Sequence, residues 1–258
     1  MNLQRRIWLT GASSGIGLAL AELLAAEGHR LALTARRREP LLELAARYPG
    51  QILVITADLT DRDAIGEIAE QIDAAWGALD WAILNAGACE YMELPAFSAS
   101  LVERVMQVNV LATANCIEAA LPLLRRGTQP RLVAVGSSVT YLPLPRAEAY
   151  GASKAALRYL MQSLELDLVD EGIATTLVSP GFVETPMTAN NDFPMPMQLT
   201  SAQAAQRILI GLERGKREIR FPGPFIAILR LMAALPGWLR VALTKRKTGA
   251  ASQRQETN

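Results

Sequence analysis

The sequence contains very little histidine or cysteine. Its 258 residues include one histidine, His29, and two cysteines, Cys89 and Cys116, which do not form a CxxC pair. One histidine cannot supply a histidine-rich metal cluster or a Ser-His-Asp relay, so we expect no metal site and interpret His29 as a surface turn residue. The sparse cysteines and the absence of a signal-peptide pattern around Arg5 and Arg6 predict a reducing, cytoplasmic location.

An excess of one charge sign is also missing. The chain has 26 basic and 25 acidic residues, so the whole protein lacks the positive field that binds a phosphate backbone, and we expect no nucleic-acid partner. Half of the residues are hydrophobic, enough to form one continuous core. We predict one domain over residues 1–247 and a disordered polar tail over residues 248–258.

Short apolar runs alternate with helical patterns along the chain. They predict strands at Ile7–Thr10, Leu31–Thr34, Ile52–Thr56, Trp81–Leu84, Leu132–Val135 and Thr175–Val178. Near-continuous apolar strands separated by helices are typical of a parallel sheet that is buried on both faces. We therefore predict an α/β fold, a Rossmann-type doubly wound parallel sheet of about seven strands with helices on both faces.

A glycine-rich turn follows the first predicted strand. Residues 10–17 are TGASSGIG, and a helical pattern begins at once. Glycines there let backbone amides and a helix N-terminus approach a pyrophosphate. The spacing GxxxGxG departs from the usual GxGxxG dinucleotide fingerprint, and a purely structural turn would also need glycine.

The end of the second strand bears on the choice of cofactor. Arg36 follows the strand directly and no carboxylate stands there, which favours the 2′-phosphate of NADP(H) over NAD(H). The alternative is that Arg36, Arg37 and Arg38 only begin a solvated helix.

Tyr150 and Lys154 stand four residues apart at the start of a long helical pattern. That spacing places both on one helix face. A phenol with a pKa of roughly 10 is a poor base, and we expect the neighbouring ammonium to lower that pKa. YxxxK alone also occurs as an ordinary surface pair, so its context matters.

Several motifs occur together with this pair, in a fixed order. The chain resembles the short-chain dehydrogenase/reductase family over about residues 5–220, in TGASSGIG, Asn85-Ala86-Gly87, Asn109, Ser137, YxxxK and Pro180-Gly181. The resemblance implies that Ser137, thirteen residues before Tyr150, orients the substrate oxygen. It also implies that Tyr150 exchanges the hydroxyl proton, that Lys154 binds the nicotinamide ribose, and that Asn109 holds a water molecule of a proton relay.

The same resemblance implies a cofactor site. Asp58 would fix the adenine, Asn85 to Gly87 would back the cofactor, and Val183 and Thr185 would contact the carboxamide. The expected cofactor-binding residues are Gly11, Ser13, Ser14, Gly15, Ile16, Gly17, Arg36, Asp58, Leu59, Asn85, Ala86, Gly87, Tyr150, Lys154, Pro180, Gly181, Val183 and Thr185.

Three segments should wall the substrate crevice: residues 88–95, 139–149 and 186–200. They are mostly apolar, and Met187, Met195, Met197 and Phe193 suggest a lid over a hydrophobic substrate, although an ordinary mobile loop would have the same composition. Cys89 lies near this crevice without an evident base, so we interpret it as a buried filler.

The segment 221–247 is strongly apolar and carries basic residues. Its two runs, Phe225–Leu235 and Trp238–Leu243, are too short to span a bilayer. They could lie in a membrane interface or pack on the lid or a second subunit, and we favour a protein contact.

Together these features predict an NADP(H)-preferring oxidoreductase that interconverts a carbonyl and an alcohol, in the reductive direction, on an apolar small molecule and as a homodimer or homotetramer. One alternative is a catalytically idle, nucleotide-binding scaffold. Another is an epimerase or dehydratase of a related fold, but fewer than 80 residues follow Gly181, which leaves little room for their substrate domain.

Overall fold

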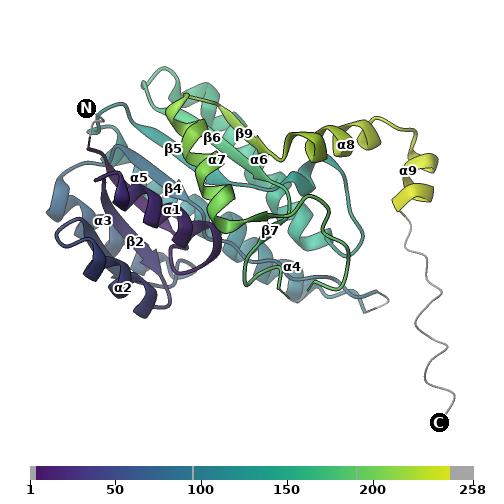
Figure 1. Ribbon diagram of the computed structural model, residues 1–258, viewed down its shortest axis with the longest axis horizontal. Helices are drawn as coiled ribbons and strands as arrows, with labels where there is room; N and C mark the ends of the chain where they lie inside the picture. The colour runs from purple at the N-terminus through teal and green to yellow at the C-terminus, as the bar shows by residue number, and fades with distance from the viewer. Residues whose placement is uncertain (1–3, 95, 190, 245–258) are drawn as a thin grey trace, which may run out of the picture.

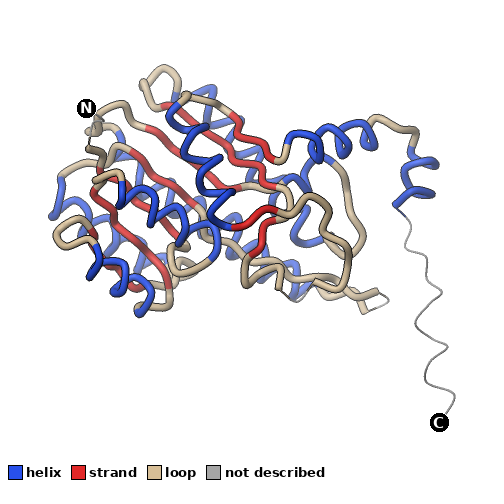
Figure 2. The backbone as a smooth tube through the Cα atoms, in the orientation of Figure 1, coloured by secondary structure: helices blue, strands red, loops and turns tan. Residues whose placement is uncertain are grey.

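The computed structural model describes residues 4–94, 96–189 and 191–244. At its centre lies a parallel seven-stranded sheet of order β3-β2-β1-β4-β5-β6-β9 (Figure 2). Its strands are β1 (Arg6–Thr10), β2 (Arg30–Ala35), β3 (Ile52–Thr56), β4 (Trp81–Leu84), β5 (Arg131–Val135), β6 (Ala174–Pro180) and β9 (Glu218–Phe221). The strand order reverses between β1 and β4, which makes the sheet doubly wound.

Helices cover both faces of the sheet (Figure 1). One face carries α1 (Gly15–Ala26), α2 (Glu39–Arg47) and α7 (Ser201–Glu213), and the other carries α3 (Arg62–Trp76), α5 (Ala112–Leu124) and α6 (Glu148–Leu168). Successive side chains of β1 point to opposite faces of the sheet, so both faces need a cover. Ile7 and Leu9 pack under α1, while Trp8 packs on the opposite side with α3. The fold predicted from the sequence is confirmed.

The remaining elements either lie beside the carboxyl ends of the strands or follow the last strand in the chain. A π-helical turn, η1 (Gln107–Leu111), joins α4 (Ala99–Met106) to α5, and a 3-10 helix, η2 (Ser138–Tyr141), follows β5. The short strands β7 (Val183–Glu184) and β8 (Leu199–Thr200) pair with each other. The chain then continues through α8 (Gly223–Ala233) and α9 (Gly237–Thr244).

The six predicted strands are confirmed, each within two residues at its ends. The seventh, β9, was not located by sequence, because it is a four-residue edge strand. In β9 buried Ile219 and Phe221 alternate with Glu218 and Arg220, which is too short a pattern to separate from a loop.

The interpretation of His29 as a surface residue is wrong. His29 is fully buried, its Nδ1 accepts a hydrogen bond from the Arg5 backbone N–H at 3.3 Å, and burial lowers the pKa of its imidazole. Ligand atoms of Glu27 and Glu213 lie within 4.8 Å of it. Because Nδ1 is an acceptor, Nε2 carries the proton of the neutral ring, and Arg5 already pairs with Glu213 at 2.9 Å, so this is the arrangement of a structural histidine.

The described part of the C-terminal apolar segment forms the two short helices α8 and α9. Among the described residues no helix is long and apolar enough to cross a membrane. The predicted disordered tail, residues 248–258, lies outside the described residues, as do residues 245–247 of the apolar segment.

Candidate active site

The carboxyl ends of β4, β5 and β6 bring the predicted catalytic residues together. Ser137 follows β5, Tyr150 and Lys154 lie in the first turns of α6, and Asn109 lies in η1. This edge of the sheet is where ligands bind in doubly wound folds.

Ser137 and Tyr150 form the centre of this group. The Ser137 Oγ accepts a hydrogen bond from the Val139 backbone N–H at 3.2 Å, which caps η2 and fixes the serine side chain. Burial raises the pKa of Tyr150 to about 12, and a hydrogen bond with Ser137 acts in the opposite direction. The Tyr150 phenol is therefore protonated at neutral pH.

Lys154 is almost completely buried beside this pair. Its Nζ donates a hydrogen bond to the Val135 carbonyl at 2.9 Å and lies 5.9 Å from the centre of the Tyr150 ring. Burial lowers the pKa of the Lys154 ammonium to about 8. The expectation that Lys154 lowers the pKa of Tyr150 is thus wrong for this structure, because burial disfavours the charged form of both groups.

Asn109 ties three parts of the site to one another. Its Oδ1 accepts from the Ala88 backbone N–H at 2.8 Å, and its Nδ2 donates to the Ala88 carbonyl and to the Ser153 Oγ, each at 2.9 Å. Ser153 in turn donates to the Tyr150 carbonyl at 2.8 Å. Sequence reasoning missed Ser153, although it stands directly before Lys154. The water molecule expected on Asn109 stays a prediction.

Gly87 explains how closely these groups pack. A Cβ atom at Gly87 would lie 3.1 Å from the Asn109 Oδ1 and 3.3 Å from the Lys154 Nζ. The predicted NAG segment therefore borders the same space as the asparagine and the lysine.

The N-terminus of α1 fits a phosphate group. Ser14 at the N-cap forms no side-chain cap, and the first turn of this described helix carries no acidic residue, so its positive end is left uncompensated. A Cβ at Gly17 would lie 2.2 Å from the Gly11 carbonyl oxygen, which only glycine tolerates. Asn85 holds the turn by donating to the Thr10 and Gly11 carbonyls, both at 3.2 Å.

Two arginines border the end of the cradle where an adenosine would lie. Arg36 is exposed, and its charge contributes to lowering the pKa of Asp58, after hydrogen bonds from Thr60. Arg37 donates to the Ser13 carbonyl in the glycine turn at 2.8 Å. The strand-end position singles out Arg36 in the sequence, whereas the contact of Arg37 was not predicted, although its place in the run Arg36-Arg37-Arg38 could have suggested it.

The opposite end of the cradle is bordered by the segment after β6. A Cβ at Gly15 would lie 2.9 Å from the Thr185 methyl group, so this predicted carboxamide contact lies against the glycine turn. Val183 is buried in β7, and the Gly181 N–H donates to the Phe221 carbonyl at 2.7 Å, which connects the loop to β9.

Four aromatic rings lie in a row, and two of them, Tyr91 and Phe193, belong to the predicted crevice walls. Tyr91 contacts Phe193 edge to face at 5.5 Å, Phe193 contacts Phe182 at 6.1 Å, and Phe182 contacts Phe225 of α8 at 5.4 Å. Phe193 thus joins the 186–200 segment to the rest of the wall. Burial raises the pKa of the Cys89 thiol, which fits a filler and not a nucleophile.

Arg146 connects the three predicted crevice walls through ion pairs. Its guanidinium pairs with Asp192 of the 186–200 segment at 2.6 Å and with Glu93, and it stacks over the Tyr91 ring at 5.3 Å. Its carbonyl accepts from the Met92 N–H at 2.9 Å. We refer to Arg146, Asp192 and Glu93 as the clasp. Not all methionines of the predicted lid are buried, since the side chains of Met187 and Met197 are nearly half exposed.

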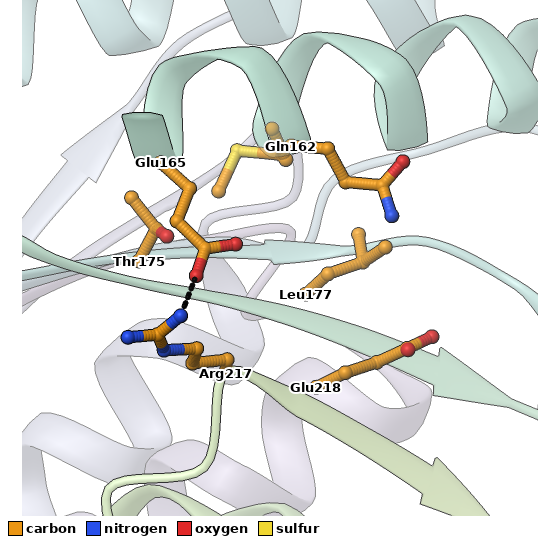
Figure 3. Close-up of a pocket in the computed structure, with 7 residues that line it drawn as sticks. Gln162, Glu165, Thr175, Leu177, Arg217 and Glu218 are labelled. Atoms are coloured by element: carbon orange, nitrogen blue, oxygen red, sulfur yellow. Dashed lines mark ion pairs between the residues drawn. The ribbon is translucent and has the colours of Figure 1, made fainter. Parts of the chain in front are cut away.

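A separate hollow of ≈ 160 Å³ opens elsewhere, between α6, β6 and β9 (Figure 3). An ion pair between Glu165 and Arg217, 3.2 Å apart, crosses it. Glu165 stands three turns along α6 from Lys154, and Thr175 in the wall lies near the amino end of β6. This hollow is therefore not the crevice at the carboxyl ends of the strands.

Comparison with known proteins agrees with this geometry. The family described as short chain dehydrogenase matches residues 5–194. An uncharacterized oxidoreductase of Myxococcus xanthus is 35% identical over 94% of this chain and 97% of its own, and one of Mycobacterium tuberculosis is 32% identical over 90% and 94%.

Two solved structures resemble the chain. A short-chain dehydrogenase from Streptomyces avermitilis superposes with a TM-score of 0.78 at 26% identity, over 93% of this chain and 98% of that one. An alcohol dehydrogenase from Thermococcus sibiricus, complexed with 5-hydroxy-NADP, has a TM-score of 0.76 at 23% identity over 85% and 96%, which shows a shared fold. The chain belongs to the short-chain dehydrogenase/reductase family of oxidoreductases.

Proposed function

We propose that the protein is an NADP(H)-preferring oxidoreductase that reduces the carbonyl group of an apolar small molecule to an alcohol. The observation that carries this proposal is the group of half-buried Ser137 and Tyr150 with buried Lys154, beside a glycine turn and an open helix N-terminus. The nicotinamide, when bound, would supply the hydride.

The proton side of the reaction belongs to the chain's own residues. With its pKa raised to about 12, Tyr150 enters the reaction as a phenol, which suits a proton donor to a developing alkoxide. Ser137, held by the Val139 N–H, would position the carbonyl oxygen. Lys154 would bind the ribose, and Asn109 with Ser153 would hold the start of α6 in place.

The preference for NADP(H) rests on the two arginines at the far end of the cradle. No carboxylate occupies the end of β2, where exposed Arg36 follows, and Arg37 donates to the glycine turn, so both arginines could face a 2′-phosphate. The relative from Thermococcus sibiricus was solved with an NADP analogue, which supports the same preference. NAD(H) remains the alternative cofactor.

The proposal also includes the substrate class, the oligomeric state, the location and the domain organisation of the enzyme. The ring row from Tyr91 to Phe225 favours an apolar substrate, and the family suggests a homodimer or homotetramer. A cytoplasmic location and a single domain over residues 1–247 stay part of this proposal.

The direct test is a panel of apolar ketones, aldehydes and secondary alcohols with NADPH or NADP+, followed by cofactor absorbance. We expect turnover of at least one carbonyl with NADPH. Tight NADPH binding without any turnover would instead favour a catalytically idle scaffold, and the absence of binding would contradict the proposal altogether.

A further inference from the structure

The C-terminal part of the chain differs from the rest in charge. Residues 1–218 contain 24 acidic and 19 basic side chains, whereas residues 219–258 contain one acidic and seven basic ones. From residue 219 to residue 247, across α8 and α9, every ionisable side chain is an arginine or a lysine. A segment with one charge sign on a body of opposite net charge favours a negatively charged partner surface.

Helix α8 has one packed face and one open face. Phe225, Ile226 and Leu229 are buried in a small cluster with Leu142, which anchors the helix to the body. On the other side Leu231 is 70% exposed, and Ile228 is also exposed. The open face is therefore apolar where a soluble helix would be polar.

Helix α9 continues this open apolar surface. Trp238 is 74% exposed, and Val241 and Leu243 are exposed as well. Figure 1 shows α9 standing away from the sheet and its covering helices. A helix of eight residues has little stability in water, so burial of these side chains against a partner would stabilise it.

We propose that α8 and α9 bind the surface of an anionic lipid bilayer and lie in its interface. The two helices have 11 and 8 residues and are separated by Pro236, so they suit the interface and not a span. Tryptophan is enriched at the level of lipid headgroups, where Trp238 would lie. Arg230, exposed between the apolar residues, would meet the negative headgroups.

A second copy of the chain is a less suitable occupant of this surface. A two-fold contact pairs the same patch with itself. Because residues 219–247 contain no carboxylate, such a contact would bring arginines of one segment towards those of the other with no partner charge in either segment. Headgroups with negative charge remove this conflict. The sequence-based preference for a protein contact is therefore replaced here by a lipid contact.

Lipid binding would place the bilayer next to the crevice wall. The buried face of α8 packs on Leu142 of the predicted crevice wall 139–149 and, through Phe225, on Phe182, whose ring contacts Phe193 of the wall 186–200. The lipid contact itself does not depend on the proposed reaction, so either can fail without the other.

The test is co-sedimentation of the full-length protein with vesicles of phosphatidylcholine alone or with about one-third phosphatidylglycerol, at low and high salt. We expect binding to the anionic vesicles to be stronger by about tenfold or more, and to weaken with salt, because negative headgroups attract the basic residues and salt screens that attraction. Leu231→Glu combined with Trp238→Glu should abolish the binding, and Arg230→Glu should weaken it.

The matched control is Leu166→Glu, since Leu166 on α6 is 74% exposed and lies outside the C-terminal segment. It should bind vesicles as the wild type does, and thermal unfolding should be unchanged in all variants because the replaced side chains are exposed. Wild type that stays in the supernatant, or equal binding of the double variant, would overturn the proposal. So would a double substitution that changes only the oligomeric state in sedimentation velocity, which would identify a protein interface.

Discussion

Burial of Lys154, a residue of the proposed active site, destabilises the folded protein. The Lys154 ammonium is buried with one hydrogen bond, to Val135, and burial lowers its pKa from 10.5 to about 8. Between these two values the unfolded chain binds a proton that the folded protein has released, so this group makes the protein more stable as pH rises from 8 to 10.5. Below pH 8 both states are charged and the cost is constant.

Lys154→Met should therefore stabilise the protein while abolishing turnover. We expect the free energy of unfolding to rise by about 1–2 kcal/mol at pH 7, since the lost hydrogen bond offsets part of the gain from removing a buried charge. The gain should shrink towards pH 10, where the wild-type lysine is neutral when folded. Urea unfolding of both proteins at pH 7 and pH 10 measures this gain. A gain over wild type that is smaller at pH 7 than at pH 10 would refute the prediction.

Arg36 is the residue on which cofactor preference depends most directly. Arg36→Ala should weaken NADPH binding by about tenfold to a hundredfold and leave NADH binding nearly unchanged, because a charge-assisted contact to the 2′-phosphate contributes about 1.5–3 kcal/mol. Arg38→Ala is the control, since Arg38 is exposed at the start of α2. Fluorescence titration with both nucleotides gives the constants; equal loss for NADPH and NADH would rule out a phosphate contact.

At the scale of elements, the glycine turn is held by close backbone contact. Gly17→Ala would place a Cβ 2.2 Å from the Gly11 carbonyl oxygen, and we expect a loss of about 2–4 kcal/mol in the free energy of unfolding. Gly66→Ala in α3 is the counterpart, because that helical position is exposed and a Cβ there meets no atom within 4 Å. It should stabilise the protein by about 0.5–1 kcal/mol. Thermal unfolding of both variants checks the opposite signs.

The clasp joins three chain segments, and its loss should free the lid. Arg146→Met keeps the aliphatic stem but removes the ion pairs with Asp192 and Glu93. We expect the KM for the carbonyl substrate to rise by about fivefold with NADPH affinity unchanged, together with faster proteolysis within residues 186–200. Arg104→Met, which removes an exposed pair with Glu90, should change neither. Unaltered proteolysis in the Arg146 variant would mean that the clasp does not restrain the lid.

The sequence predicted those elements whose signal is local. Continuous apolar runs located six strands, and residues close in the chain, such as Tyr150 and Lys154, revealed the site because one helix positions both. Contacts between distant segments were not predicted: Arg146 meets residues about 50 positions away, and Ser153 gains its role only through Asn109 in another helix. Burial was equally out of reach, as His29 and the pKa values of Tyr150 and Lys154 show, since each depends on what packs around the group.

At the scale of the whole molecule, a doubly wound sheet brings four separate parts to one edge. The glycine turn after β1, Asn109, Ser137 and the start of α6 meet there because parallel strands end on the same side. The acidic body and basic C-terminal helices then give the molecule two ends of different character. The central claim concerns the site at the edge of the sheet, where Tyr150 would donate a proton.

The measurement that tests this claim most directly compares Tyr150→Phe with Tyr159→Phe in NADPH-dependent carbonyl reduction. Tyr159 lies on the same helix and is 77% exposed, so its loss of a hydroxyl should leave kcat unchanged. Tyr150→Phe should lower kcat by about a thousandfold while NADPH still binds, because only the proton donor is removed. Normal turnover by the Tyr150→Phe enzyme would contradict the account.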